Sequence, residues 1–205
     1  MTWRIIPLST GHLGSVVDLH LRSFPGFFLS FLGKKFLSEF YRSYVSSESS
    51  IGLIAVDEST NIVLGAVVGP LEPEGYFRRL VLRRWWAFAL ASLPAVVKRP
   101  AIVFRLFRAV HYRGDSPLGQ SLALLSSIAV APEAQGLGIG QELVKAWLQE
   151  VRCRGGQGAF LTTDAEANEA VNCFYQRLGW KLDCTFVTTQ RRRMNRYVYD
   201  FLERP

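Results

Sequence analysis

The sequence predicts a single mixed α/β domain, residues 1–205, in which helices flank a central sheet. Two observations lead to this fold class. Strand-like runs at 51–56 and 61–69 are joined by a short polar turn, which is typical of an antiparallel hairpin. Strand and helix patterns then alternate from residue 122 onward, and this order indicates parallel pairing in part of the sheet.

The N-terminal part predicts two helices before the hairpin. Apolar residues recur at helical spacing over 8–24, and the Phe24-Pro25-Gly26 sequence ends that helix. Helical spacing resumes over 27–47, where Gly33 is a weak point because glycine disfavours a helix interior.

Residues 70–122 interrupt this pattern and are predicted to form a helical insertion. Helical spacing over 76–93 and again over 101–113 indicates two helices, separated near Pro94 and Pro100. The insertion also carries the positive charge of the chain, whose net charge is +7. Between residues 76 and 113 there is no acidic residue and there are nine basic ones: Arg78, Arg79, Arg83, Arg84, Lys98, Arg99, Arg105, Arg108 and Arg113.

The C-terminal part predicts alternating strands and helices. The expected strands are 122–130, 158–163, 180–189 and 194–202, and the expected helices are 136–154 and 164–179. Asp164 is expected to cap the start of the second helix, and Gly179 its end.

Composition excludes several classes of protein. The three cysteines show no metal-ligand spacing and no disulfide framework, which fits a reducing compartment. The first residues lack the charged and apolar regions of a signal peptide, so we expect a cytoplasmic protein. The longest uncharged run of residues 76–113, Trp85–Val97, has 13 residues and includes a proline, which is too short for a transmembrane helix.

Three glycines, Gly136, Gly138 and Gly140, stand between an apolar run and an amphipathic helix, as in phosphate-binding turns. A nucleoside-triphosphate loop needs Lys and Ser or Thr after its last glycine, and here Gln141 and Glu142 follow. A dinucleotide fingerprint needs a glycine at position 141. Neither alternative fits these residues.

The run from Gln135 to Gly140 resembles the [QR]-x-x-G-x-[GA] motif of the GCN5-related N-acetyltransferase (GNAT) superfamily. The segment NEAVNCFYQRLGW at 168–180 resembles the helix and following strand of the same family. The resemblance is close over 120–180, and extends over 1–69 in the order of elements. It implies an acyl-coenzyme A N-acyltransferase fold with a mixed, mostly antiparallel twisted sheet, and an enzyme that uses acetyl-coenzyme A and no metal.

The resemblance also implies roles for individual residues. The strand before the glycines is expected to splay from its neighbour and to bind the pantetheine arm through its backbone. Tyr175 is the expected acid that protonates the departing thiolate, and Asn168 is expected to hydrogen-bond the coenzyme arm. The implied coenzyme-binding residues are Ile128, Ala129, Val130, Gln135, Gly136, Leu137, Gly138, Ile139, Gly140, Gln141, Asn168 and Tyr175.

The general base stays open at this point. Many family members have a glutamate on the strand before the glycines, where this chain has Ser126 and Ser127. The alternatives considered are Glu72, Glu74, His111 and Asp115, while His12 and His20 are interpreted as structural or exposed, and Arg191–Arg193 as a solvated turn.

For the acceptor, the cationic insertion favours a small-molecule amine such as an amino sugar or a nucleotide-linked amino sugar. Alternatives are a protein N-terminal or lysine amine, or a non-catalytic coenzyme-binding regulator. The basic and aromatic residues of 76–113 also suit an anionic membrane surface. A homodimer contact is another alternative use of this segment, and nucleic acid is not expected as a partner because no such module is visible.

Overall fold

Four antiparallel strands form the first sheet, in the order β1-β2-β3-β5. They are β1 (Trp3–Pro7), β2 (Ser50–Asp57), β3 (Val63–Pro70) and β5 (Ser127–Val130). The computed structural model describes residues 2–83, 85–98, 121–188 and 191–202. The predicted hairpin is confirmed as β2 and β3, whereas β1 was not recognised in the sequence, because five residues with a proline at the end carry little strand signal.

The second sheet has the order β4-β6-β8-β7. Its strands are β4 (Ala123–Leu124), β6 (Gly158–Asp164), β7 (Lys181–Val187) and β8 (Arg193–Asp200). The β4–β6 pair is parallel, and β6–β8 and β7–β8 are antiparallel. The parallel pairing expected from the strand and helix order is therefore confirmed, at this one position of the described sheets.

The predicted strand 122–130 changes from one sheet to the other. The backbone N–H of Leu125 donates to Phe160 O on β6 (3.0 Å), and the N–H of the next residue, Ser126, donates to Val68 O on β3 (2.9 Å). One strand therefore pairs with β6 at its start and with β3 at its end. The two sheets separate beyond this point, as the family resemblance implied.

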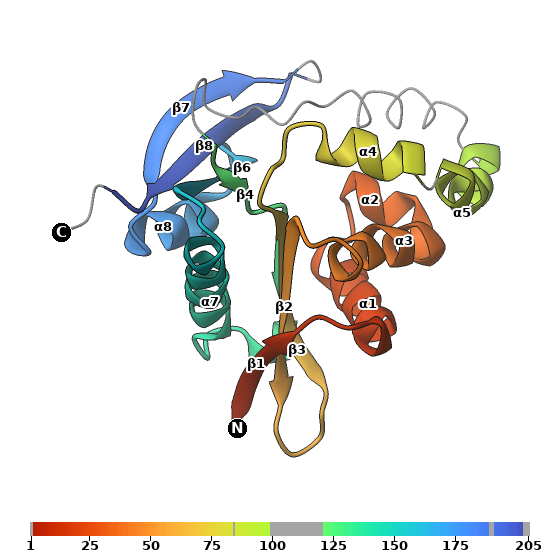
Figure 1. Ribbon diagram of the computed structural model, residues 1–205, viewed down its shortest axis with the longest axis horizontal. Helices are drawn as coiled ribbons and strands as arrows, with labels where there is room; N and C mark the ends of the chain where they lie inside the picture. The colour runs from red at the N-terminus through yellow and green to blue at the C-terminus, as the bar shows by residue number, and fades with distance from the viewer. Residues whose placement is uncertain (1, 84, 99–120, 189–190, 203–205) are drawn as a thin grey trace.

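Helices cover the first sheet on both sides (Figure 1). On one side lie η1 (Thr10–His12), α1 (Leu13–Ser23), α2 (Phe28–Phe31), α3 (Gly33–Val45), α4 (Tyr76–Arg83) and α5 (Trp85–Lys98). On the other side lie η2 (Pro132–Ala134), α7 (Ile139–Cys153) and α8 (Glu169–Arg177). The weak point predicted at Gly33 is confirmed, because its φ of 86° breaks the segment into α2 and α3.

The predicted helix 76–93 differs from the observed α4 and α5. Two helices replace it, and α5 continues through Pro94 as far as Lys98. A proline removes one backbone donor from a helix, which weakens it but does not oblige it to end there. The second predicted helix, 101–113, lies outside the described residues.

Close packing fixes α7 against the first sheet. A Cβ on Gly65 would lie 2.8 Å from Leu143 Cδ1, and one on Gly69 would lie 2.7 Å from a ring carbon of Trp147. The indole of Trp147 is fully buried, so Gly69 provides the room for it, as Gly65 does for Leu143. This contact fixes the N-terminus of α7 beside the end of β5. None of the helices among the described residues has the length and apolar character to span a bilayer.

Candidate active site

A cleft of about 810 Å³ opens where the two sheets separate. The changeover at Leu125–Ser126 leaves β5 at the edge of the first sheet, with backbone groups that no described strand pairs on that side. The walls come from α1 and the segment after it, from β5, from the start of α7, and from the ends of β6 and β8. Of the predicted backbone contacts, Ile128 and Val130 line the cleft directly, and Ala129 lies between them in β5.

The glycine turn ends in the helix N-terminus at one end of this cleft. Gly136 and Gly138 both have φ of 80°, a left-handed conformation that glycine adopts without strain, and Gly138 is the N-cap of α7. The first N–H that closes a turn of α7 is that of Glu142, which donates to Gly138 O (3.1 Å). The N–H groups before it lack a helical acceptor and, with the helix dipole, provide a site for an anion.

The predicted residues of this turn lie together. Gln135, Gly136, Gly138, Ile139, Gly140 and Gln141 line the cleft. Leu137 is half exposed and lies between two lining residues. A Cβ at Gly136 or Gly138 would have no neighbour within 4 Å, so at both positions glycine is required by conformation and not by packing within the protein.

Tyr175 of α8 lies against the cleft from the other side. Its ring packs against Phe174, Trp180 and Tyr197, and the side chain is buried. Burial raises the pKa of the Tyr175 hydroxyl above its usual value, so the phenol stays protonated and can act as a donor. No hydrogen bond joins this hydroxyl to another described residue.

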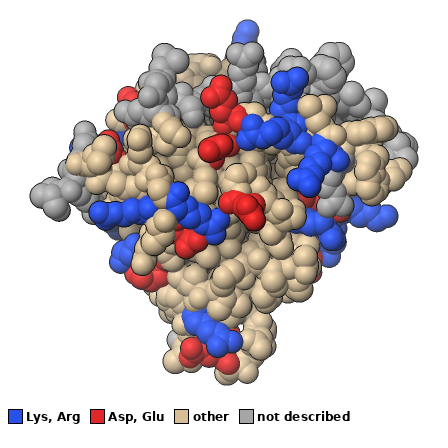
Figure 2. All heavy atoms as spheres, in the orientation of Figure 1, with Lys and Arg blue, Asp and Glu red and all other residues tan. Residues whose placement is uncertain are grey.

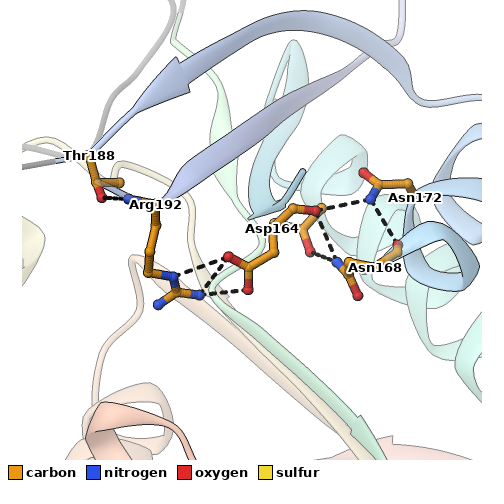
Figure 3. A network of polar contacts seen from close by, with 6 residues as sticks. Asp164, Asn168, Asn172, Thr188 and Arg192 are labelled. Carbon is orange, nitrogen blue, oxygen red and sulfur yellow. Dashed lines mark hydrogen bonds and ion pairs between the residues drawn. The ribbon is translucent and has the colours of Figure 1, made fainter. Parts of the chain in front are cut away.

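The turn between β6 and α8 shows that the predicted cap of this helix, Asp164, is wrong. Asp164 is the last residue of β6, and the N-cap of α8 is Asn168, so the helix begins at Glu169 and not at residue 164. Figure 3 shows the reason. The Asn168 amide donates to Thr163 Oγ1 (2.8 Å) and to Asp164 O (3.2 Å), which holds the intervening residues as a loop.

Asn172 extends this network to the second sheet. Its amide group donates to Asp164 O (3.0 Å) and Asn168 O (2.8 Å). Its oxygen accepts from Asn195 Nδ2 (3.0 Å) and from the Tyr197 hydroxyl (2.9 Å). With its donors used in the loop, Asn168 can offer a coenzyme arm its side-chain oxygen but not its NH₂ group.

Arg192 lies in an exposed turn, as predicted, but its side chain also forms part of the cleft wall. Its guanidinium donates to both carboxylate oxygens of Asp164 (2.7 and 2.6 Å from Nη2), and both residues line the cleft (Figure 3). The backbone N–H of Arg192 donates to Thr188 Oγ1 (3.2 Å). This bidentate pair holds the β7–β8 turn against the end of β6. The two residues are 28 positions apart, so no local sequence pattern predicts the contact.

His20 was interpreted as structural or exposed; it is buried, with 4% of its surface exposed, and it also lines the cleft. Its Nδ1 lies 2.8 Å from the Tyr41 hydroxyl, which lies 3.5 Å from Ser127 Oγ on β5. Burial lowers the pKa of His20 to about 4 and raises the pKa of Tyr41 to about 12, so both are neutral around pH 7. His20 Nε2 is buried and has no hydrogen-bond partner among the described residues.

The other candidate bases are not brought to the cleft by the described structure. Glu72 and Glu74 are exposed and are not among the residues that line it. His111 and Asp115 lie outside the described residues. His12 forms a local contact with Ser9 Oγ (2.9 Å).

A second groove, of about 710 Å³, lies between α7 and α8. It shares Gln141, Ala170 and Phe174 with the cleft, so the two hollows adjoin at the start of α7. The charged residues that line it are Lys145, Arg152 and Arg177, and no acidic residue is among its described lining.

Comparison with known proteins finds a family match over part of the chain. Residues 102–182 match the acetyltransferase (GNAT) domain, and the match begins inside the predicted insertion. The chain is 29% identical over 121 residues to N-alpha-acetyltransferase 30 of Schizosaccharomyces pombe, covering 58% of this chain and 73% of that protein. It is 39% identical over 62 residues to a mycothiol acetyltransferase of Paenarthrobacter aurescens, covering 29% of this chain and 19% of that protein.

The fold agrees with these matches. The crystal structure of Arabidopsis thaliana NAA60 in complex with acetyl-CoA superposes with a TM-score of 0.60 at 17% identity, covering 98% of this chain and 99% of that one. The predicted fold class is confirmed, and so, at the level of the family, is the enzyme class of acetyl-coenzyme A-dependent N-acetyltransferases. Residues 102–182 therefore match the GNAT acetyltransferase domain, and the described fold is that of GNAT N-acetyltransferases.

Proposed function

We propose that this protein transfers an acetyl group from acetyl-coenzyme A to the amine of a small molecule, by direct attack within a ternary complex. The observation that carries the proposal is the separation of the strand 122–130 from β6 beside a glycine-opened helix N-terminus. An open strand edge and a row of free N–H groups at the same cleft suit a ligand with an amide-rich arm and a diphosphate.

Different residues of the chain bind different parts of acetyl-coenzyme A. The N–H groups of 136–141 bind the diphosphate, and the free edge of β5 binds the pantetheine arm through Ile128 and Val130. The three cations of the α7–α8 groove suit the 3′-phosphate of the coenzyme, because the groove adjoins the diphosphate site and its described lining has no acidic residue. When bound, acetyl-coenzyme A supplies the reactive thioester.

Two groups of this chain act on the reacting atoms. A backbone N–H on the open edge of β5 faces the position of the thioester oxygen, where a preorganised donor stabilises developing negative charge. The Tyr175 hydroxyl, kept protonated by burial, donates its hydrogen to the departing sulfur.

The acceptor end of the cleft supports a small amine with an apolar part. Phe24, Phe27 and Leu29 form an apolar wall beside His20, and Arg192 with Met194 lies across from them. An amino sugar or its nucleotide conjugate is the class that we favour, and the basic insertion adds to this preference. A peptide N-terminus or a lysine side chain is the alternative acceptor.

An acceptor screen tests the proposed function. Release of free thiol from acetyl-coenzyme A is measured against a panel of amino sugars, nucleotide-linked amino sugars, diamines and peptides. We expect turnover with one class of amine and only slow hydrolysis without an acceptor. Tight coenzyme binding with no thiol release from any amine would instead support a non-catalytic coenzyme-binding regulator.

A cytoplasmic location and a homodimer remain predictions.

A further inference from the structure

The proposed reaction requires that the acceptor nitrogen lose a proton, and the β5 strand provides no carboxylate for this purpose. Among the described residues that line the cleft, the side chains with a basic atom that is unprotonated at neutral pH and can accept a proton are His20 and Asp164. Asp164 is held in a bidentate pair by Arg192 and sits at the β6 end of the cleft. His20 is therefore the remaining group.

The position of His20 is fixed from both sides. Its ring packs against Phe24, with a centroid distance of 4.9 Å, and edge-on against Tyr41 at 5.7 Å. The Nδ1–Tyr41–Ser127 chain ties the imidazole to β5, one residue before Ile128. Since Nδ1 is engaged, the second nitrogen, Nε2, is the one left for a ligand, and a buried imidazole nitrogen without a partner is costly unless a ligand satisfies it.

We propose that His20 is the general base, with Nε2 accepting a proton from the acceptor nitrogen. This inference rests on the proposed function. The nitrogen attacks the thioester carbon, a C–N bond forms and the C–S bond breaks. The nitrogen gives one proton to His20 Nε2, from which it passes to solvent, and the sulfur takes one from Tyr175, which solvent replaces. The products are the acetamide and free thiol.

The electrostatics of the site define how such a base works. Tyr41, the titratable group in contact with His20, stays neutral, and the two charged residues in the described cleft lining, Asp164 and Arg192, neutralise each other. His20 is itself uncharged above about pH 4 because of burial. A base of this strength takes the proton only once attack has made the nitrogen acidic, so the acceptor reacts as the neutral amine. We expect kcat/KM to rise with pH up to the pKa of the acceptor, without an inflection from His20 between pH 5 and 8.

Two variants separate a base from a hydrogen-bond acceptor. His20→Asn places an amide near Nδ1 and keeps a partner for Tyr41, while His20→Gln places an amide oxygen near Nε2 that can accept a hydrogen bond but not a proton. If His20 is the base, both variants lose kcat by about 100-fold or more and keep the coenzyme affinity of the wild type. If it only positions the amine, His20→Gln keeps most of the activity.

The control is His12→Asn, because His12 lies in the short helix before α1 and outside the cleft lining. Thermal unfolding shows whether each variant is folded. A kcat of either His20 variant within a few-fold of the wild type overturns the assignment. A wild-type protein that binds coenzyme but releases no thiol with any amine overturns the proposed function itself, and the assignment falls with it.

A separate observation concerns α5, which is apolar on both of its faces. The buried face packs Phe88 against Phe36 of α3 at 5.0 Å. On the other face, Trp85, Trp86 and Leu90 are 65%, 54% and 64% exposed. A helix that is apolar all round is ordinarily covered by protein or lipid.

Basic side chains border this face. Arg78 and Arg83 of α4 are exposed, as is Leu82 between them, and neither α4 nor α5 has an acidic residue. In Figure 2, Lys and Arg side chains gather in the part of the molecule where Figure 1 places α4. Tryptophans next to arginines, without acidic residues, suit the interface of an anionic membrane.

We infer that the exposed face of α4 and α5 docks on an anionic lipid surface. The probe is vesicles of phosphatidylglycerol and phosphatidylcholine, compared with phosphatidylcholine alone. We expect sedimentation with the anionic vesicles only, a blue shift of tryptophan fluorescence, and release at high salt.

Matched variants test the inference residue by residue. Trp85→Ser with Trp86→Ser, or Arg78→Glu with Arg83→Glu, should lower vesicle binding about tenfold or more. The controls are Ile62→Ser, which removes an exposed apolar residue of the β2–β3 turn, and Arg4→Glu, which reverses an exposed charge of β1. Absence of vesicle binding by the wild type, or a dimer that the tryptophan variants dissociate, overturns it.

Discussion

The wall of the cleft formed by β5 and α7 offers a ligand mainly backbone groups, whereas the wall formed by α1 to α3 offers side chains. The first wall depends on a few positions close together in the sequence, where the chain turns at Gly136 and Gly138. The second brings His20 of α1 to Tyr41 of α3, whose hydroxyl reaches Ser127 of β5 on the first wall. Backbone groups are the same whatever the side chain, so they suit a co-substrate that a whole family shares. Side chains can differ from one protein to the next, so they suit recognition of different acceptors.

The largest effect should come from breaking the backbone wall. Gly138→Val places a β-branched side chain at φ 80° and in the open space where the diphosphate would lie. We expect the affinity for acetyl-coenzyme A to fall by at least about 100-fold, or about 2.7 kcal/mol. Isothermal titration measures this directly.

Gly155→Val is the matched control for that change. Gly155 follows the other end of α7 and also has φ of 80°, and a Cβ at this position would likewise have no neighbour within 4 Å. The two variants therefore carry similar backbone strain. Equal coenzyme affinity of Gly138→Val and the wild type would contradict the proposed diphosphate site.

The next largest effect should come from the proposed acid, Tyr175, and should change turnover rather than coenzyme binding. Tyr175→Phe removes the hydroxyl that we propose protonates the departing sulfur, but keeps the packing against Trp180 and Tyr197. We expect kcat to fall about 10- to 100-fold, with coenzyme affinity nearly unchanged. Steady-state kinetics with an amine found in the screen provides the measurement, and an unchanged kcat would remove Tyr175 as the acid.

A smaller effect concerns the side-chain wall in the absence of any ligand. The pKa of His20 is about 4 in the folded protein and about 6.5 when unfolded. Between these values the unfolded chain binds a proton that the folded chain does not, so the free energy of unfolding should fall as pH drops from 6.5 to 4. We expect this contribution to reach about 2 kcal/mol and to level off below pH 4.

His20→Leu isolates this contribution. Its free energy of unfolding, from denaturant titrations at several pH values, should change less between pH 6.5 and 4 than that of the wild type. His12→Asn is the control for general effects of losing a histidine. The same pH dependence in His20→Leu and the wild type would show that the imidazole is not buried as described.

The smallest effect should come from the α7–α8 groove, which adjoins the cleft at the start of α7. Arg152→Ala and Arg177→Ala remove cations near the proposed 3′-phosphate site. We expect each to raise the KM for acetyl-coenzyme A about fivefold, which is about 1 kcal/mol. Acetyl-dephospho-coenzyme A, which lacks that phosphate, should show no such difference between variants and wild type. An equal increase with both compounds would place the phosphate elsewhere.

The predictions from sequence succeeded where the signal was local. The hairpin, the break at Gly33 and the glycine turn each depend on neighbouring residues, and the structure contains all three. The parallel pair followed from the order of strands and helices along the chain. The N-cap of α8 was misplaced because Asp164 is as good a capping residue as Asn168, and only the hydrogen bonds to Thr163 and Asp164 decide between them.

The acceptor side of the cleft could not be predicted in the same way. A histidine on an amphipathic helix has the same sequence pattern whether it is a core residue or a ligand-facing one. Its contact with Tyr41 spans 21 positions, and the Tyr41 contact with Ser127 spans 86. The Arg192–Asp164 pair joins a residue interpreted as part of a solvated turn to one interpreted as a helix cap.

The crossing of the strand 122–130 from one sheet to the other has a mechanical consequence. Of the described strands, those of this segment alone pair with both sheets, so the peptide between Leu125 and Ser126 marks the line along which the sheets part. A ligand that hydrogen-bonds to the unpaired edge of β5 lies between the two sheets and replaces some of the hydrogen bonds that a neighbouring strand would make. We expect coenzyme to slow amide hydrogen exchange at Ile128 and Val130 more than in the β2–β3 hairpin, so that the molecule stiffens along one seam when it is loaded.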